Sequence, residues 1–195
     1  MSGLIFVISG PSGSGKTTLV KELLADRSLK GLLHRSISYT TRPKRSGEGS
    51  GKDYSFVSQK AFRALLRNKK ILEWTKYLGY YYGTPYRGFE RQIKKGRHLA
   101  LCLDLKGAEK IKRLYPENAV SIFVLPPSLG ALNERIRKRC SKTCPREING
   151  RLKLAKREIR RAHRYDYCLI NKDLKRALEG LRKIVKKEIL RRRER

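Results

Sequence analysis

A glycine-rich run near the N-terminus has the residue types and the spacing of a phosphate-binding loop. Gly10, Gly15, Lys16 and Thr17 fit the pattern G-x-x-x-x-G-K-[ST], with an apolar run before it and a helical pattern after it. Glycines let successive N–H groups point at phosphate oxygens, and a helix N-terminus adds further unpaired N–H groups there. We expect Lys16 to reach the β and γ phosphates of a nucleotide and the Thr17 hydroxyl to ligate Mg²⁺. A glycine turn that binds nothing would leave Lys16 and Thr17 without a purpose.

The segments that must hold this loop alternate between strand-like and helical patterns. Apolar runs recur at residues 4–9, 98–104, 120–125 and 167–170. Helical patterns lie nearby, including 16–24 after the loop and 174–190 at the end. This alternation predicts an α/β fold with a central parallel sheet covered by helices on both faces. Ligands of such sheets bind at the C-terminal ends of the strands, where the loop lies.

Two stretches differ from this alternation. Residues 36–84 are polar, glycine-rich and aromatic, which predicts an inserted, mainly β lobe with one short helix near 60–67. From residue 126 to about 164 the chain has a helical pattern dense in arginine, with an interruption at 141–145, as in a hinged lid. We expect one domain made of a core (1–35, 85–127 and 160–195), a lobe (36–84) and a lid (128–159).

Length and composition favour a single soluble domain. With 39% hydrophobic residues, the 195-residue chain can bury one good core. It has no run long enough to span a bilayer, and its start lacks the features of a signal peptide. The four cysteines are few and irregularly spaced, which suits a reducing compartment rather than a disulfide framework. We therefore expect a cytoplasmic protein that does not contact a membrane.

The net charge is extreme, with 48 Lys and Arg against 17 Asp and Glu, or +31. Such a field attracts polyanions and steers nucleotides towards any site. Much of the excess lies between Arg182 and Arg195. We favour a solvated helix face with a frayed basic tail over a dedicated polyanion site, so any polyanion binding through this surface is expected to be non-specific.

The phosphate-binding loop, the inserted lobe and the arginine-rich lid together resemble the plan of the nucleoside monophosphate kinases. Several motifs within the lobe closely resemble those of the guanylate kinase family, and the resemblance spans about residues 10–177. These motifs are Ser38-Tyr39-Thr40-Thr41-Arg42, Arg45-Ser46-Gly47-Glu48, Gly51-Lys52-Asp53-Tyr54, and Glu73-Trp74 followed by Tyr82-Gly83-Thr84. The resemblance implies a P-loop three-layer fold with a GMP-binding lobe and a helical lid. It also implies Mg-dependent transfer of the ATP γ-phosphoryl group to GMP or dGMP, giving ADP and GDP, in purine nucleotide metabolism.

The same resemblance implies where GMP binds. Two arginines and two tyrosines would hold its phosphate, and two hydroxyls with one carboxylate would contact guanine. A carboxylate can accept from guanine N1–H and from its 2-amino group. The implied GMP residues are Ser38, Arg42, Arg45, Tyr54, Glu73, Tyr82, Thr84 and Asp104.

For the ATP side, the resemblance implies the loop, one residue near the C-terminus, and a metal site at Thr17 and Asp104. The ATP residues are Gly10, Pro11, Ser12, Gly13, Ser14, Gly15, Lys16, Thr17, Thr18 and Asn171. Phosphoryl transfer needs positioning and charge neutralisation, so the implied catalytic set is cationic. It consists of Lys16, Arg42 and the two lid arginines, Arg139 and Arg151. Other lid arginines, such as Arg135, are taken as solvated.

The chain also departs from the family pattern. Leu101-Cys102-Leu103-Asp104 has Cys102 where the family usually has the first of two aspartates, and the lid is one residue longer and less acidic than usual. Cys140 and Cys144 are spaced like two metal ligands, but two ligands do not make a tetrahedral zinc site, and His163 or Cys168 would have to join them. We do not expect zinc.

Two other functions fit part of the sequence. A non-catalytic guanylate-kinase-like module could hold a phosphopeptide or protein in its lobe, but it would have no use for Lys16 and Thr17. A nucleic-acid-binding accessory protein would use the positive charge, but it leaves the motifs of residues 38–84 unexplained.

Overall fold

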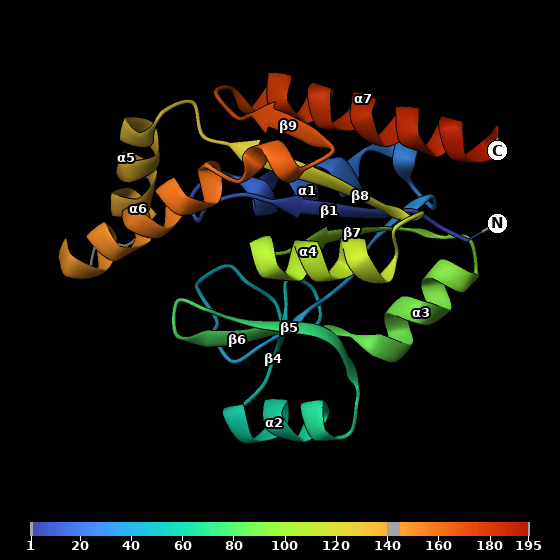
Figure 1. The fold of residues 1–195 in the computed structure, drawn as a ribbon, viewed down its shortest axis with the longest axis horizontal. Helices are drawn as coiled ribbons and strands as arrows, with labels where there is room; N and C mark the ends of the chain where they lie inside the picture. The colour runs from blue at the N-terminus through green and yellow to red at the C-terminus, as the bar shows by residue number, and fades with distance from the viewer. Residues whose placement is uncertain (1, 140–144, 195) are drawn as a thin grey trace.

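Five parallel strands form the central sheet, in the order β2-β7-β1-β8-β9 (Figure 1). The computed structural model describes residues 2–139 and 145–194. The strands are β1 (Ile5–Ser9), β2 (Leu33–Arg35), β7 (His98–Cys102), β8 (Ala119–Leu125) and β9 (Tyr167–Ile170). The predicted parallel sheet and its four strand-like runs are confirmed. The sequence interpretation missed β2, because three residues are too few to show a strand pattern.

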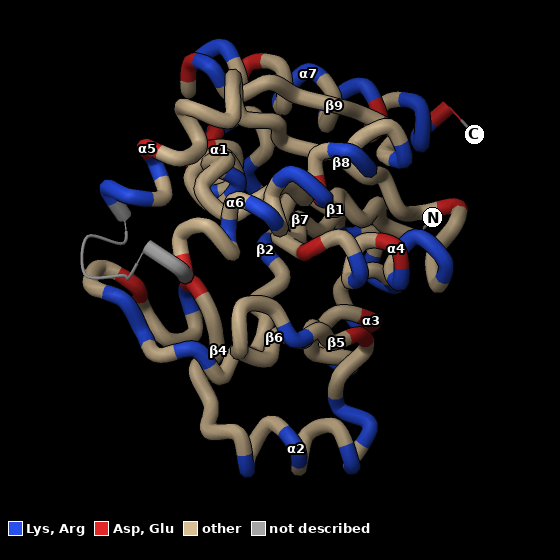
Figure 2. The backbone as a smooth tube through the Cα atoms, turned by 60° about the vertical axis from the view of Figure 1, so that its left-hand side comes forward, with Lys and Arg blue, Asp and Glu red and all other residues tan. Residues whose placement is uncertain are grey.

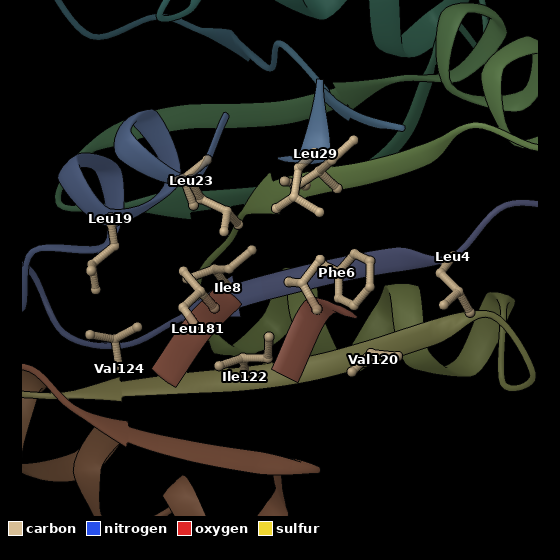
Figure 3. Close-up of a cluster of buried hydrophobic side chains, with 14 of the residues drawn as sticks. Leu4, Phe6, Ile8, Leu19, Leu23, Leu29, Val120, Ile122, Val124 and Leu181 are labelled. Carbon is tan, nitrogen blue, oxygen red and sulfur yellow. The ribbon is translucent and has the colours of Figure 1, made fainter. Parts of the chain in front are cut away.

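Helices cover both faces of this sheet. They are α1 (Lys16–Ala25), α3 (Tyr86–Lys94), α4 (Leu105–Leu114) and α7 (Leu174–Arg193). Side chains alternate along β1, so Phe6 and Ile8 pack against α1 and α7, whereas Ile5 and Val7 pack against α3 and α4. Figure 3 shows Leu19 and Leu23 of α1 with Leu181 of α7 around the first of these clusters. All five residues of β1 are buried. The segment that follows β1 is therefore anchored to a well-packed strand.

Residues 39–85 form a second sheet with the order β4-β3-β6-β5. Its strands are β3 (Tyr39–Thr40), β4 (Ser55–Phe56), β5 (Ile71–Tyr77) and β6 (Tyr80–Pro85), and α2 (Gln59–Arg67) lies on its outer side. β5 and β6 form an antiparallel hairpin whose turn has Leu78 and Gly79 at positive φ. This sheet and α2 confirm the predicted mainly β lobe with its short helix.

Two further helices pack on each other beside the end of the sheet: α5 (Leu129–Arg139) and α6 (Pro145–Ile159). Leu132 and Ile136 of α5 meet Ile148 and Ala155 of α6 in a small apolar cluster. Short 3-10 helices lie at Arg27–Leu29 and Ala162–Arg164. Among the described residues, no helix combines the length and the apolar character needed to cross a bilayer.

The C-terminal helix is longer than expected. We predicted a frayed tail from Arg191, but α7 continues to Arg193, so this part of the prediction is wrong. Asp173 caps its start by accepting a hydrogen bond from the Arg176 N–H. At its other end, an Arg192 guanidinium N–H donates to the Ser2 hydroxyl at 3.2 Å, which ties the two ends of the chain together.

Candidate active site

The loop between β1 and α1 has a backbone that only glycine adopts easily. Gly10, Gly13 and Gly15 have φ values of 142°, 90° and 92°. A Cβ at Gly10 would lie 2.3 Å from the Val124 carbonyl oxygen, and one at Gly15 would lie 2.2 Å from the Asn171 Nδ2. The loop therefore needs glycine both for its conformation and because the Val124 backbone and the Asn171 side chain approach it closely.

Lys16 and Asn171 hold this loop from two sides. The Lys16 ammonium donates to the carbonyl oxygens of Gly10 (2.6 Å) and Pro11 (2.9 Å). The Asn171 Nδ2 donates to the Ser14 carbonyl at 2.8 Å, and its backbone N–H donates to the Leu125 carbonyl. Asn171 directly follows β9, so the loop is tied to the end of the neighbouring strands.

Asp104 follows the end of β7 and caps α4. Its Oδ1 accepts from the Gly107 N–H, and its Oδ2 accepts from the Thr75 hydroxyl, both at 2.9 Å. Thr17 lies in the first turn of α1 and lines the same cleft. Among the described residues, no group of three or more His, Cys, Asp or Glu forms a metal site. One carboxylate and one hydroxyl nevertheless fit Mg²⁺, which takes few protein ligands when phosphates supply the rest.

Arg42 is a buried cation held by an ion pair. One guanidinium nitrogen lies 2.7 and 2.9 Å from the two Glu48 carboxylate oxygens, and another donates to the Pro43 carbonyl at 2.7 Å. Its guanidinium also lies 5.5 Å from the centre of the Tyr54 ring. Glu48 in addition accepts from the Arg45 backbone N–H. Glu48 belongs to the Arg45-Ser46-Gly47-Glu48 motif, but nothing in the sequence indicated that it positions Arg42.

Tyr54 and Tyr82 place two phenols beside Arg42. Their ring centres are 5.9 Å apart, in an edge-on arrangement. Burial raises the pKa of Tyr54 to about 12, so its hydroxyl stays protonated at neutral pH and can donate to an anion. The two phenols and the two nearby arginines, Arg42 and Arg45, line one part of the cleft.

Glu73 is a buried carboxyl with one oxygen left to bind a donor. Its side chain is 2% exposed, and its Oε1 accepts from the Thr84 hydroxyl at 2.6 Å. Its Oε2 has no hydrogen-bond partner among the described residues. Burial raises the pKa of Glu73 to about 7, and the Thr84 hydrogen bond opposes that shift. A buried acceptor without a partner is costly, so this oxygen fits a ligand that brings N–H groups.

The arginines of α5 and α6 do not all lie where the sequence interpretation expected them relative to the cleft. Arg139 ends α5, but its side chain lies outside the described residues, as do Cys140 and Cys144. Arg151 lies on α6 and donates to Glu147 at 2.6 Å. Arg135, which we took as solvated, instead lines the cleft and donates to the Asn171 carbonyl at 3.1 Å.

Glu158 and Tyr77 are site residues that the sequence interpretation missed. Glu158, on α6, is 6% exposed, and its burial raises its pKa to about 7, although the nearby Lys16 ammonium opposes this shift. Tyr77, at the end of β5, lies beside Glu158, and burial raises the pKa of its phenol. α6, the hairpin and the loop therefore meet here. The sequence carried little signal for Glu158, because a second acidic residue, Glu147, lies on the same basic helix and is exposed.

A single cleft of about 550 Å³ brings most of the expected residues together. Expected residues that line it are Gly10, Ser12, Gly13, Gly15, Lys16, Thr17, Thr18, Ser38, Arg42, Arg45, Tyr54, Glu73, Tyr82 and Asp104. Four others are buried and do not line it: Pro11, Ser14, Thr84 and Asn171. Cys102 also forms part of the wall, and burial raises the pKa of its thiol, which stays neutral.

Comparisons with known proteins agree on one family. The family model described as guanylate kinase matches residues 3–188. A guanylate kinase of Dechloromonas aromatica is 41% identical over 95% of this chain and 90% of its own length. One of Synechocystis sp. is 42% identical over 96% of each chain. The crystal structure of guanylate kinase from Anaplasma phagocytophilum matches with a TM-score of 0.78 and 34% identity, covering 96% of this chain and 86% of that one.

Proposed function

The chain belongs to the guanylate kinase family of ATP:GMP phosphotransferases, and we propose that its cleft transfers the γ-phosphoryl group of ATP to GMP, giving ADP and GDP. One observation carries this assignment. The same cleft holds the Lys16 loop, which suits a polyphosphate, and the unpartnered Glu73 Oε2, which suits a base with N–H donors. An enzyme that transfers a phosphoryl group from a nucleoside triphosphate to a guanine nucleotide needs both features.

The loop is proposed to bind ATP. Its N–H groups and the start of α1 face the phosphates, and Lys16 leaves the Gly10 and Pro11 carbonyls to reach the β and γ oxygens. Thr17 and Asp104 would hold Mg²⁺, which would neutralise part of the charge of the phosphates. Asn171 acts from behind the loop, through the Ser14 carbonyl, and need not touch the nucleotide.

The lobe is proposed to bind GMP. Arg42, Arg45, Tyr54 and Tyr82 donate to its phosphate, and the bidentate Glu48 carboxylate keeps the Arg42 guanidinium oriented. Glu73 accepts from guanine N1–H and from the 2-amino group. Ser38 and Thr84 are assigned to the base as well, and Thr84 also fixes the orientation of the Glu73 carboxyl.

Transfer is proposed to depend on cations that converge on the moving phosphoryl group. Lys16 and Arg42 belong to the walls of the cleft, and Arg139 and Arg151 belong to a lid of residues 128–159 that closes on a core of 1–35, 85–127 and 160–195. The GMP lobe is residues 36–84. Closure excludes water and completes the set, so the protein supplies positioning and charge rather than a nucleophile.

A coupled assay tests this function. The protein is given ATP with GMP, AMP, CMP or UMP, with and without a chelator of divalent cations. We expect ADP production with GMP, only a small fraction of that rate with the other nucleotides, and none with the chelator. Equal rates with AMP would overturn the assignment of guanine to the Glu73 site. We place the activity in the cytoplasm, as a step of purine nucleotide metabolism.

A further inference from the structure

The lobe has a second surface, on the side away from the cleft. Along β5, Glu73, Thr75 and Tyr77 line the cleft, so the alternate residues Trp74 and Lys76 point the other way. Trp74 is 47% exposed. We call Trp74, Lys76, Tyr81 and the exposed basic side of α2 (Lys60, Arg63 and Arg67) the outer lobe face.

The aromatic part of the outer lobe face is held rigidly. Tyr81 lies opposite Lys76 in the hairpin, and its ring stacks on the buried Phe62 of α2 at 5.4 Å between centres. The Trp74 ring packs against Tyr81 at 5.8 Å, and the Lys76 ammonium lies 5.6 Å from the centre of the Tyr81 ring. An exposed indole is thus supported from beneath and has a cation next to it.

The charge on the outer lobe face has one sign. Residues 54–72 contain five Lys or Arg and no Asp or Glu. The acidic residues of 36–84 are Glu48, Asp53 and Glu73, and all of them line the cleft on the other side. Figure 2 shows α2 with blue segments and no red one. Lys60, Arg63 and Arg67 share one side of α2 at spacings of three and four residues.

The other basic surface, on α7, is different. Its basic residues are interspersed with Glu179, Glu188 and Glu194, and the helix contains no aromatic residue. Arg182 pairs with Asp26, and Arg191 pairs with Glu188. The positive charge of α7 is therefore partly neutralised, and the helix has no aromatic ring on which a nucleobase could stack.

We propose that the outer lobe face binds single-stranded nucleic acid without sequence preference. An unpaired base stacks on Trp74, and the flanking phosphates contact Lys76 and the basic side of α2. Base stacking on an aromatic ring with a cationic track for the backbone is how single strands are bound non-specifically. A duplex cannot offer an unpaired base to Trp74. A bilayer would meet one indole and no apolar helix face, because Phe62, Leu65 and Leu66 of α2 are less exposed than its basic side.

Trp74 is the only tryptophan of the chain, so its fluorescence reports on this face directly. A short oligouridylate is titrated into the protein, and we expect saturable quenching that weakens steeply as salt is added. UMP at the same nucleotide concentration provides the matched control and is expected to quench far less. Absence of any change in Trp74 fluorescence while the labelled oligonucleotide binds would overturn the proposal. The proposal would also be overturned if phosphatidylserine vesicles shifted the Trp74 emission to the blue while the oligouridylate caused no quenching.

Two variants with equal loss of charge separate this face from the overall charge. Lys60→Gln/Arg63→Gln/Arg67→Gln removes three charges from α2, and Lys183→Gln/Lys186→Gln/Lys187→Gln removes three from α7. Binding is measured by the anisotropy of the labelled oligonucleotide. The quantity compared is the slope of the logarithm of the association constant against the logarithm of the salt concentration, which is negative. We expect this slope to become less negative by about 2 in the α2 variant and to stay near the wild-type value in the α7 variant. Equal effects in the two variants would overturn the proposal.

Trp74→Ala isolates stacking from charge. We expect binding to weaken at least about 5-fold with the salt slope unchanged. Far-UV circular dichroism and the thermal midpoint show that each variant is folded, and kinase activity with GMP should be unchanged because none of the replaced residues lines the cleft. Failure of the kinase assignment itself would leave these binding measurements unaffected. An unchanged affinity in folded Trp74→Ala would overturn the role of the indole.

Discussion

The two walls of the cleft are built in different ways. The loop between β1 and α1 is shaped by its backbone, with three glycines at positive φ and carbonyls that face Lys16. The lobe is shaped by pairs of side chains, namely Arg42 with Glu48 and Glu73 with Thr84, and Thr75 of the lobe donates to Asp104 of the core. Backbone N–H groups recognise phosphate in any nucleotide, whereas paired side chains can be tuned to one base. Changes in the loop should therefore abolish the reaction, and changes in the lobe should redirect it.

The largest effect is expected for Lys16→Ala. Lys16 is the cation nearest to the proposed path of the phosphoryl group, and no other side chain of the loop carries charge. We expect kcat to fall by about 10⁴ while the fold and the thermal midpoint are retained. Lys21→Ala, an exposed lysine on the same helix, is the control and keeps its activity. A fully active Lys16→Ala enzyme would contradict the proposed ATP site.

Arg151→Ala tests the lid, the third part of the proposed site. If Arg151 meets the phosphates only on closure, its loss acts on the transfer step, and we expect kcat to fall by about 10³ with little change in KM for GMP. Steady-state kinetics on this variant and on Arg157→Ala, an exposed arginine of the same helix, check this. A change in KM alone would place Arg151 in nucleotide binding.

Glu73→Gln tests whether the lobe redirects the reaction. The amide can still accept from Thr84, but it presents an NH₂ group in place of Oε2, the oxygen that is proposed to accept from guanine. We expect the GMP:AMP ratio of kcat/KM to fall by about 10². Glu48→Gln is the matched control, because it weakens the hold on Arg42 and hence the proposed phosphate contact, which GMP and AMP would share. It should lower kcat/KM for GMP and AMP alike and leave their ratio unchanged.

This contrast also explains what the sequence could predict. The Gly10 loop is a continuous run whose spacing fixes its geometry, so its position after β1 was predictable from the sequence alone. The side-chain pairs on the lobe side depend on how the hairpin and the loops fold back on each other, and Thr75 reaches Asp104 in the core, so no local pattern reveals them. The resemblance supplied Arg42, Glu73 and Thr84, but it did not show that Thr84 donates to Glu73 or that Glu48 holds Arg42.

The lid shows the same limit more strongly. Arg135 and Glu158 lie on helices dense in charged residues, and the place of Arg135 at the cleft and the burial of Glu158 depend on how α5 and α6 pack near the loop. Charge density in a sequence says which residues are ionic, but it does not say which of them turn inward. That information lies in tertiary packing, here the apolar cluster around Leu132 and Ile136.

The smallest effect concerns pH and distinguishes Glu73 of the lobe from Glu158 of the lid. Burial raises the pKa of each to about 7. Below that pH, Glu73 carries a proton and presents an O–H to guanine N–H groups, so binding must first expel the proton. In the free enzyme, kcat/KM for GMP should therefore rise up to about 10-fold per pH unit below 7 and level off above it.

The two variants decide which carboxyl produces this limb of the profile. In Glu73→Gln the rise of kcat/KM below pH 7 disappears, apart from any pH dependence that the GMP phosphate or Glu158 contributes. The difference between the profiles of wild type and Glu73→Gln gives the titration of Glu73 alone. Glu158→Gln keeps the limb, because the guanine edge is proposed to contact Glu73 rather than the lid. If instead Glu158→Gln flattens kcat/KM and Glu73→Gln does not, the group that must lose its proton lies beside Lys16 and Tyr77, and base recognition would have to be assigned to Ser38 and Thr84.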